Sequence, residues 1–429
     1  MNYSETLNYL FTAMPSFQNI GGDAYKPGLE RIMQFCARLG DPHLKYKVIH
    51  IAGTNGKGST SHALASVLQH AGYRTALFTS PHLRDFRERI RVNGSMVSEQ
   101  EVIEFVERYR PDMEELRLSF FEMTAAMAFR HFALQGVDIA VIETGLGGRL
   151  DATNIVSPIL SIITNIGIDH TKFLGSRLPQ IAAEKGGIIK DNRAVILGER
   201  SEEYTYVIEE IARLKGAELL FAEDKVEVIS QEYNTDGQLF TLRDMSNAET
   251  LDIELDMGGS YQAKNIVTAY AAIKYLDGSG EVKIPQSAIT SGFRSVVSTT
   301  SLMGRWQKLN DLPLMICDTG HNAHGLKYVM EQLRATPHKK LIMVLGFAND
   351  KKLDEILPLF DPKAHFIFTR PKVDRAFPCE EIMGVAKSLG LDCEAVDDVQ
   401  EAILHAKNIA SRKDLIFVGG SNFVVAEVY

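Results

Sequence analysis

A glycine-rich loop, residues 53–60 with the sequence GTNGKGST, constrains the fold of this chain more than any other feature. The apolar run Val48–Ala52 precedes the loop and predicts a buried strand. The segment Ser59–Ala71 follows it and predicts a helix with one apolar stripe, which Gly72 would end. A loop between a strand and a helix can wrap its backbone N–H groups around phosphate oxygens, and the helix N-terminus adds partial positive charge. The pattern therefore predicts a nucleotide phosphate site.

Lys57 lies within this loop, where its ammonium group would reach the outer phosphates as a point charge. The loop departs from the common G-x-x-x-x-G-K-[ST] pattern: Ile51 stands where that pattern has its first glycine, and Gly58 directly follows Lys57. The simpler alternative is a glycine-rich turn with a solvated lysine. The flanking strand and helix favour nucleotide binding over that alternative.

Short apolar runs followed by amphipathic helix patterns recur along the chain, which is typical of a parallel sheet covered by helices. Further strands are expected in the first part of the chain at Thr75–Thr79, Asp138–Thr144 and Ile159–Asn165. Between Glu218 and Asp256 the pattern changes to short alternating runs, with a turn signal at 234–237, and predicts a small antiparallel insertion. Four strand-like runs follow nearer the C-terminus: Leu312–Cys317, Lys340–Leu345, His365–Thr369 and Leu415–Val418.

A length of 429 residues predicts two or three domains at about 150 residues each. The uncharged stretch Ser295–Gly304 marks the expected change of domain. The predicted fold class is therefore α/β. Residues 1–296 would form a P-loop NTPase-like parallel-sheet domain with the small antiparallel insertion, and residues 297–429 a smaller Rossmann-like α/β domain. Ligands of such folds bind at the carboxyl ends of the strands.

The composition limits the classes of protein to which the chain can belong. Its formal net charge of −9 has the wrong sign for general nucleic-acid affinity, so an anionic ligand needs a locally built site. No stretch approaches the ~18 apolar residues of a membrane span, and Met1–Phe17 lacks the pattern of a secretory signal. Four scattered cysteines without a C-x-x-C pair fit a reduced, cytoplasmic chain. Since no large apolar stripe stands out, a monomer is expected.

Polar residues follow several predicted strands at their carboxyl ends. Glu143 ends the apolar run DIAVIE, and Ser80 and His170 follow two other strands. A carboxylate in this position can hold Mg²⁺ directly or through water, and the Ser80 hydroxyl could serve the same metal. A capping glutamate is the alternative for Glu143, and the metal role is favoured. For His170 and Ser80, a structural histidine and an ordinary turn stay open.

Other candidate residues are ambiguous when they are considered singly. Lys185 lies in a helical pattern whose composition is typical of a surface helix. The stretch Ser119–Glu122 fits a helix capping box, although its paired aromatic side chains could line the pocket of a flat ligand. Arg305 could stabilise phosphoryl charge and Asp318 could accept a hydrogen bond from a ribose hydroxyl, but each could equally belong to a surface ion pair.

Taken together, these segments resemble folylpolyglutamate synthase and dihydrofolate synthase, members of the Mur ligase family. The resemblance is carried, in family order, by GTNGKGST (53–60), TSPHL with FRERIRVNG (79–94), SFFEMTAAMAF (119–129), ETGLGGRLDATN (143–154), IGIDHTKFLG (166–175), AAEKGGI (182–188), SYQAKNIVTA (260–269), MGRWQ (303–307) and DTGHN (318–322). These segments cover most of the chain, so the resemblance is far more specific than a phosphate loop alone.

The resemblance implies a role for each matching residue. It assigns ATP contacts to Asn55, Gly56, Lys57, Gly58, Ser59, Asn265, Arg305 and Asp318. It assigns Mg²⁺ binding to Ser80, Glu143, His170 and Lys185, with Lys185 carbamylated, which replaces the surface-lysine interpretation. It places next to the pterin–benzoate ligand Ser119, Phe120, Phe121, Glu122, Leu150, Asp151 and Ala152, and it places His321 near the incoming glutamate. The catalytic residues implied are Lys57, Lys185 and His321.

The predicted activity is ATP-dependent ligation of L-glutamate to a folate, to dihydropteroate or to both, through an acyl phosphate. Two alternatives remain at this point. A peptidoglycan-type ligase would carry a strand-first nucleotide-sugar domain, whereas Met1–Lys45 offers only a short helical segment at 28–40. A nucleotide switch without ligase activity is the other, although the guanine-specific N-K-x-D motif is absent, since residues 349–351 have the wrong order.

Overall fold

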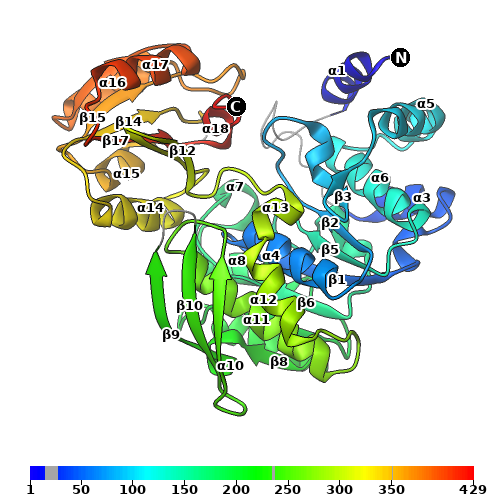
Figure 1. Cartoon of the computed structure of the whole chain (residues 1–429). Helices are drawn as coiled ribbons and strands as arrows, with labels where there is room; N and C mark the ends of the chain where they lie inside the picture. The colour runs from blue at the N-terminus through cyan, green and yellow to red at the C-terminus, as the bar shows by residue number, and fades with distance from the viewer. Residues whose placement is uncertain (15–27, 234–236, 350) are drawn as a thin grey trace. The chain divides into compact units, whose positions relative to one another are not determined.

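The computed structural model describes residues 1–14, 28–233, 237–349 and 351–429. The chain forms two compact units, which can be followed by colour in Figure 1. The first consists of Met1–Asp256 and Gln262–Leu302, and the second of Met257–Tyr261 and Met303–Tyr429. The sequence pattern put one change of domain at 296/297. The units change after Leu302, and the short segment Met257–Tyr261, which the pattern did not single out, belongs to the second unit.

The first unit is built on an eight-stranded sheet with the strand order β4-β3-β2-β5-β1-β6-β7-β8. Its strands are β1 (Lys47–Ala52), β2 (Thr75–Phe78), β3 (Ile90–Val92), β4 (Ser95–Met96), β5 (Ile139–Glu143), β6 (Leu160–Ile163), β7 (Ala194–Leu197) and β8 (Leu219–Phe221). The six strands β2, β5, β1, β6, β7 and β8 are parallel to one another. Strands β3 and β4 pair antiparallel at the edge beside β2. Ile51 pairs with Glu143, and Ala52 with Ile163, so β1, β5 and β6 end together at one edge of the sheet.

Helices cover both faces of this sheet, which explains why its central strands are almost continuously apolar. The helices of the first unit are α1 (Tyr3–Ala13), α3 (Glu30–Arg38), α4 (Lys57–His70), α5 (Glu99–Glu115), α6 (Phe120–Leu134), α7 (Thr171–Leu174), α8 (Leu178–Gly186), α9 (Thr205–Leu214), α10 (Ala222–Lys225), α11 (Gln262–Gly278), α12 (Gln286–Arg294) and α13 (Val296–Thr300). In the described part of the chain, none combines the length and apolar character that a membrane crossing requires.

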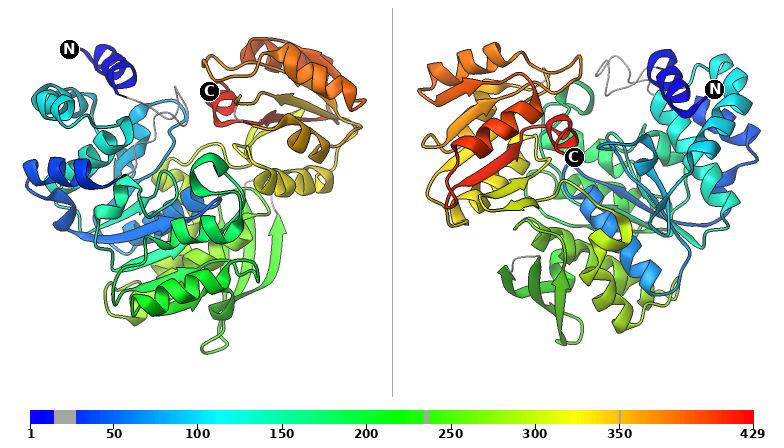
Figure 2. Two further views of the ribbon diagram at one scale, coloured as in Figure 1. Left: turned by 180° about the vertical axis from the view of Figure 1, so that it is seen from behind. Right: turned by 45° about the horizontal axis from the view of Figure 1, so that its top comes forward.

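The two faces of the sheet have different helix partners. Val48 and Ala52 point to one face, where they join apolar clusters with residues of α3, α6, α8 and α9. Helices α11 and α12 pack on α4, which also contacts β1, β2 and β5 (Figure 1). The left view of Figure 2 shows the chain from behind. Gly292 of α12 permits the close approach to α4, because a Cβ there would lie 2.5 Å from the Cα of Val67.

The predicted antiparallel insertion is present but begins later than expected. It is a three-stranded sheet of β9 (Val226–Tyr233), β10 (Gln238–Asp244) and β11 (Thr250–Leu255), in the order β11-β10-β9. The prediction starting at Glu218 was wrong for β8, which extends the main sheet by pairing in parallel with β7. Three residues are too few to reveal their partner by periodicity. The predicted turn at 234–237 lies almost entirely outside the described residues.

The second unit contains a six-stranded sheet with the order β12-β13-β17-β14-β15-β16. Its strands are β12 (Gln307–Asp311), β13 (Leu314–Cys317), β14 (Leu341–Leu345), β15 (His365–Phe368), β16 (Asp392–Ala395) and β17 (Leu415–Gly419), and its helices are α14 (Ala323–Ala335), α15 (Leu353–Ile356), α16 (Cys379–Ser388), α17 (Val399–Ile409) and α18 (Asn422–Ala426). All four predicted strands are found. The sequence missed β12 and β16, which are the half-exposed edges and carry no apolar run. The predicted α/β fold class is confirmed.

Candidate active site

The glycine-rich loop joins β1 to α4 as the sequence predicts. Gly56 stands at the N-cap of α4 with φ of 81°, a left-handed conformation that glycine adopts without strain. No side chain of the described residues caps the α4 N-terminus. The first N–H groups of a helix have no partner within the helix. This end of α4 is therefore suited to an anion such as a nucleotide phosphate.

The loop is held by the segment that follows β6, residues 164–167. The side chain of Asn165 accepts a hydrogen bond from Asn55 N at 2.9 Å, and its backbone carbonyl accepts one from Thr54 N at 3.0 Å. The Thr164 hydroxyl donates to the Asn55 carbonyl at 2.6 Å, and Gly167 N donates to the Thr54 hydroxyl at 2.9 Å. Sequence reasoning did not identify these contacts, since they depend on which strand lies beside β1.

Replacing Asn165 by alanine is expected to raise the KM for ATP about tenfold, because Asn55 N would lose the acceptor that fixes the loop. The measurement is ADP release as a function of ATP concentration. Exposed Asn408 on α17 provides a control, since Asn408→Ala should leave the KM for ATP unchanged. An unaltered KM in folded Asn165→Ala would show that the loop keeps its shape without this side chain.

Two glycines of the loop have no room for a side chain. A Cβ at Gly53 would lie 1.8 Å from the Thr164 hydroxyl oxygen, and one at Gly56 would lie 2.2 Å from Oδ1 of Asn265. Asn265, on α11, donates a hydrogen bond to the Gln262 side chain at 2.7 Å. The predicted nucleotide residue Asn265 therefore lies directly against the glycine-rich loop.

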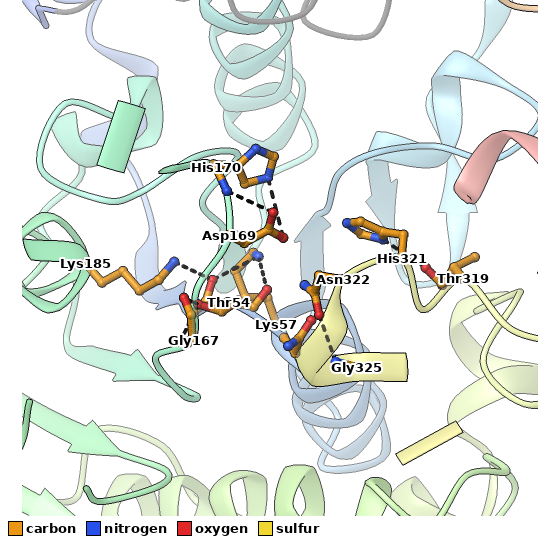
Figure 3. Close-up of polar contacts among 12 residues, drawn as sticks. Thr54, Lys57, Gly167, Asp169, His170, Lys185, Thr319, His321, Asn322 and Gly325 are labelled. Atoms are coloured by element: carbon orange, nitrogen blue, oxygen red, sulfur yellow. Dashed lines mark hydrogen bonds and ion pairs between the residues drawn. The ribbon is translucent and has the colours of Figure 1, made fainter. Parts of the chain in front are cut away.

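Two lysines share one backbone carbonyl at this loop (Figure 3). Lys57 Nζ donates to the Gly53 carbonyl at 3.0 Å, and Lys185 Nζ donates to the same oxygen at 2.8 Å. Lys185 comes from α8 and is only 3% exposed, so the surface lysine expected from composition alone was wrong. Burial, and then the nearby charge of Lys57, lower the pKa of Lys185 to about 7.

The carboxyl end of β5 carries Glu143, which is 3% exposed. Its carboxylate accepts a hydrogen bond from Ser80 N at 3.2 Å, so two of the predicted metal ligands lie together. His170 is the N-cap of α7, and its ring lies 3.9 Å from the carboxylate of Asp169. Asp169 also raises the pKa of Lys185 and had no predicted role.

Within the described residues, no three His, Cys, Asp or Glu side chains are arranged to hold a metal by themselves. Mg²⁺ is usually bound through one or two carboxylates together with water and substrate phosphates. Buried Glu143 beside Ser80 fits that kind of partial ligand set.

The predicted substrate segment Ser119–Glu122 forms the capping box of α6. The Ser119 hydroxyl accepts from Glu122 N, and Glu122 accepts from Ser119 N at 2.8 Å. Arg31 also donates to Glu122 at 3.0 Å. Neither aromatic side chain of this stretch is exposed: Phe120 is 3% exposed, and Phe121, which is half-buried, packs on Phe78.

Of the second predicted substrate segment, Ala152 is buried and Leu150 half-buried. Between them, the Asp151 carboxylate is 4% exposed and accepts hydrogen bonds from Gly145 N at 2.9 Å and Leu146 N at 2.8 Å. Burial raises the pKa of the Asp151 carboxyl group, and the hydrogen bonds oppose that rise. The carboxylate is therefore engaged within the protein.

In the second unit, Asp318 follows β13 and is 2% exposed. Its carboxylate accepts hydrogen bonds from the Tyr261 hydroxyl at 2.5 Å, Trp306 N at 2.8 Å and Gly320 N at 2.7 Å. Burial raises the pKa of Asp318, and these donors, together with the nearby charge of Arg305, oppose the rise. Tyr261, which sequence reasoning gave no role, thus orients a predicted nucleotide residue.

Two more predicted residues of this unit, Arg305 and His321, lie near Asp318 in the sequence. Arg305 hydrogen-bonds to the Gly304 carbonyl at 3.3 Å and to the Thr319 hydroxyl. His321 Nδ1 lies 2.9 Å from the Thr319 carbonyl, and Asn322 caps α14 by accepting from Gly325 N at 2.8 Å (Figure 3). The loops after β13 and before β12 therefore present an arginine and a histidine.

Two family models match the chain. The Mur ligase middle domain matches residues 51–273, and the Mur ligase glutamate ligase domain matches residues 304–422. The Bacillus subtilis dihydrofolate synthase/folylpolyglutamate synthase is 31% identical over 418 residues, which cover 94% of each chain.

Solved structures agree with these matches. Escherichia coli FolC in complex with DHPP and ADP is 29% identical with a TM-score of 0.85, covering 100% of this chain and 97% of that chain. The Yersinia pestis bifunctional folylpolyglutamate synthase/dihydrofolate synthase, complexed with AMPPNP and a Mn ion, is 28% identical with a TM-score of 0.84. The match covers 100% of this chain and 97% of that chain.

Proposed function

The chain belongs to the Mur ligase family, and from this membership we propose how its residues carry out the reaction. The protein is an ATP-dependent ligase that forms an amide bond between L-glutamate and a folate, dihydropteroate or both. The relatives give no support to a nucleotide switch without ligase activity. The observation that carries the proposal is the uncapped N-terminus of α4 with Lys57 and Lys185 beside it.

A carboxylate is a poor electrophile because its oxygen is a poor leaving group. In the proposed reaction, a carboxylate oxygen of the folate or dihydropteroate attacks the γ-phosphorus of ATP, and the bond to the β–γ bridging oxygen breaks to release ADP. The amino nitrogen of glutamate then attacks the acyl carbon. The C–O bond to phosphate breaks, phosphate leaves, and the nitrogen loses a proton.

Several residues of the first unit act on the phosphates in this proposal. The N–H groups of the loop, together with Asn55, Gly56, Gly58 and Ser59, hold them at the helix end. Lys57 leaves the Gly53 carbonyl and stabilises the charge that develops during transfer. Asn265 borders the same loop from α11.

Residues of the second unit have roles of their own in this proposal. Asp318 accepts a hydrogen bond from a ribose hydroxyl, oriented by Tyr261 and Trp306. Arg305 adds positive charge near the transferred phosphoryl group, and His321 contributes near the incoming glutamate. The pterin–benzoate part would lie along Ser119–Glu122 and Leu150–Ala152, with Phe121 offering a partly accessible ring.

The enzyme uses ATP and a divalent metal, as the complexes with ADP and with AMPPNP and Mn in its neighbours support. We propose Mg²⁺ as the metal, held by Glu143, Ser80 and His170, with Lys185 contributing as a carbamate. When bound, the metal would neutralise charge on the phosphate oxygens. Glu143 fits because it is a buried carboxylate beside the phosphate loop's strand.

Replacing Glu143 by glutamine is expected to raise the Mg²⁺ concentration for half-maximal activity at least about tenfold, because an amide is a weaker ligand than a carboxylate. The measurement is a Mg²⁺ titration of ADP release, repeated with Mn²⁺. Exposed Glu209 on α9 provides the control Glu209→Gln. An unchanged metal requirement in Glu143→Gln would exclude this residue from the metal site.

The test of the whole proposal is phosphate release with dihydropteroate and with tetrahydrofolate, each with and without glutamate. Release that requires both glutamate and one of the pterin substrates is expected. The substrate that supports release defines whether the enzyme is a dihydrofolate synthase, a folylpolyglutamate synthase or both. Release that depends on neither compound would contradict ligation. A monomeric state and a cytoplasmic location stay predictions.

A further inference from the structure

Three buried polar side chains connect β1 to the loop that follows β5. These are His50, Thr153 and Asp151, and each is at most 4% exposed. His50 Nε2 lies 2.8 Å from the Thr153 hydroxyl, which in turn hydrogen-bonds to Oδ1 of Asp151. Oδ2 of Asp151 accepts the N–H groups of Gly145 and Leu146. We name these three side chains the buried polar chain.

The position of His50 is unusual for its strand. It lies on the central strand β1, with its side chain on the same face as those of Val48 and Ala52, which belong to apolar clusters. A fully buried polar group is costly unless it is hydrogen-bonded. The hydrogen bond with Thr153 satisfies Nε2, whereas Nδ1 of His50 has no hydrogen-bond partner among the described residues. The contact with Thr153 therefore offsets part of the cost of burying the ring.

The available protons define the direction of each hydrogen bond. Thr153 N donates to Oδ1 of Asp151 at 2.9 Å, and with Gly145 and Leu146 this makes three backbone donors around the carboxylate. These hydrogen bonds oppose the rise in the Asp151 pKa that burial causes, and the Thr153 hydroxyl donates its single proton to Oδ1 of the carboxylate. His50 must then donate from Nε2. Burial lowers the pKa of His50 to about 3, so the ring is a neutral Nε2–H tautomer in ordinary buffers.

The loop held by this chain borders the residues proposed for the acid substrate. A Cβ at Gly145 would lie 2.4 Å from the ring of Phe121, so the loop backbone lies directly against that ring. Further along, a Cβ at Gly148 would lie 2.9 Å from the carbonyl oxygen of Lys185. A shift of the Gly145–Leu146 backbone would therefore move the surface on which the folate or dihydropteroate is proposed to lie.

We propose that His50 and Thr153 are positioning residues for the acid substrate: through Asp151 they fix the Gly145–Leu146 backbone against Phe121. The inference rests on the proposed ligase function and deepens it. His50 and Thr153 touch no substrate, and they act only through the carboxylate of Asp151.

The test uses two substitutions at Thr153, one that removes the hydroxyl group and one that keeps it. Thr153→Val keeps the branched shape and removes the hydroxyl, whereas Thr153→Ser keeps the hydroxyl. In the full-length enzyme, Thr153→Val is expected to raise the KM for the pterin substrate about tenfold while the KM for ATP stays within about twofold of wild type. Thr153→Ser is expected to match wild type in both constants.

A double variant tests whether His50 acts through Thr153. His50→Leu should raise the KM for the pterin substrate, and His50→Leu with Thr153→Val should raise it no further than Thr153→Val alone, because the chain is already broken. Multiplying effects in the double variant would overturn the inference. Equal rises in the two KM values of Thr153→Val, or a wild-type KM for the pterin substrate, would also overturn it.

The outcomes separate this inference from the proposed function. If wild type and Thr153→Ser show no glutamate-dependent ADP release, the proposed function fails. If both are active and Thr153→Val has the same constants, only the positioning role fails. If Thr153→Val does not fold, the state of the His50 ring is measured instead by NMR spectroscopy of ¹⁵N-histidine-labelled wild type. One imidazole that stays a neutral Nε2–H tautomer from pH 5 to 8, and whose signal changes in Thr153→Ser, is expected; its absence contradicts the proposal.

Discussion

Replacing Lys57 by alanine is expected to reduce glutamate-dependent ADP release by about a hundredfold to a thousandfold. In the structure, Lys57 Nζ lies over the loop at 3.0 Å from the Gly53 carbonyl and 3.3 Å from the Thr54 carbonyl. Phosphate oxygens are stronger acceptors than these neutral carbonyls, so the ammonium group would move to them. Its charge then opposes the negative charge that accumulates when the γ-phosphoryl group moves.

The measurement is coupled ADP release at saturating ATP, glutamate and dihydropteroate or tetrahydrofolate. Lys45→Ala, at an exposed position before β1, should behave as wild type. ADP affinity should fall much less than turnover, because the loop N–H groups remain in Lys57→Ala. Turnover near the wild-type rate would remove the phosphate loop from the mechanism.

The sequence predicts the phosphate loop well because the information is local. A buried strand, a glycine-rich turn and a helix follow one another, and each has its own periodicity or composition. Val48–Ala52 and Ser59–Ala71 differ from the observed β1 and α4 by at most two residues at each end. The residues that hold the loop could not be predicted in this way. Asn165 contacts Asn55 only because β6 pairs with β1, and such pairing depends on distant parts of the chain.

The same distinction explains the errors at single residues. Composition made Lys185 typical of a surface helix, since α8 is short and its neighbours are mixed in polarity. Its burial arises because the last turn of α8 meets the glycine-rich loop, a contact across more than a hundred residues of chain. The contacts of Asp151 with Gly145 N and Leu146 N could likewise not be predicted from the sequence, and its assignment to the substrate by resemblance stays a prediction.

The shared carbonyl of Gly53 links electrostatics to the proposed chemistry. Lys57 Nζ and Lys185 Nζ both bind this oxygen, so the two ammonium groups lie close together and repel each other. Deprotonation of Lys185 relieves the repulsion, and the neutral amine can then react with CO₂ to give a carbamate and a proton. The product is an anion that attracts Lys57 and a metal. The low pKa of Lys185 thus favours the modification that the family resemblance implies.

Replacing Lys185 by methionine is expected to lower turnover strongly and, at the same time, to stabilise the fold. The variant removes a buried ammonium group and keeps a side chain of similar length. The Gly53 carbonyl keeps a partner in Lys57. In buffer depleted of CO₂ at pH 6.5, we expect a gain on the order of 2 kcal/mol in the free energy of unfolding. Turnover should fall at least about a hundredfold, since no carbamate can form.

The pKa of Lys185 determines how the free energy of unfolding changes with pH. The pKa of Lys185 is lowered from 10.5 to about 7 in the folded chain. Between these values the unfolded chain binds a proton that the folded chain has released, so the stability of the wild type rises with pH across that window. Below about pH 7 the folded chain carries the buried charge at its full cost. The advantage of Lys185→Met should therefore be largest near pH 6 and should shrink steadily towards pH 10.

Urea unfolding of wild type and Lys185→Met at pH 6.5 and pH 9 measures this difference, with exposed Lys387→Met as the control for the substitution itself. If Lys185→Met is stabilised equally at both pH values, burial of the ammonium group does not destabilise the wild type, and the argument from its pKa would fail. Full activity in Lys185→Met would instead exclude the lysine from catalysis. Stabilisation together with lost turnover is the combination expected of a residue that is buried for its chemistry at the expense of the fold.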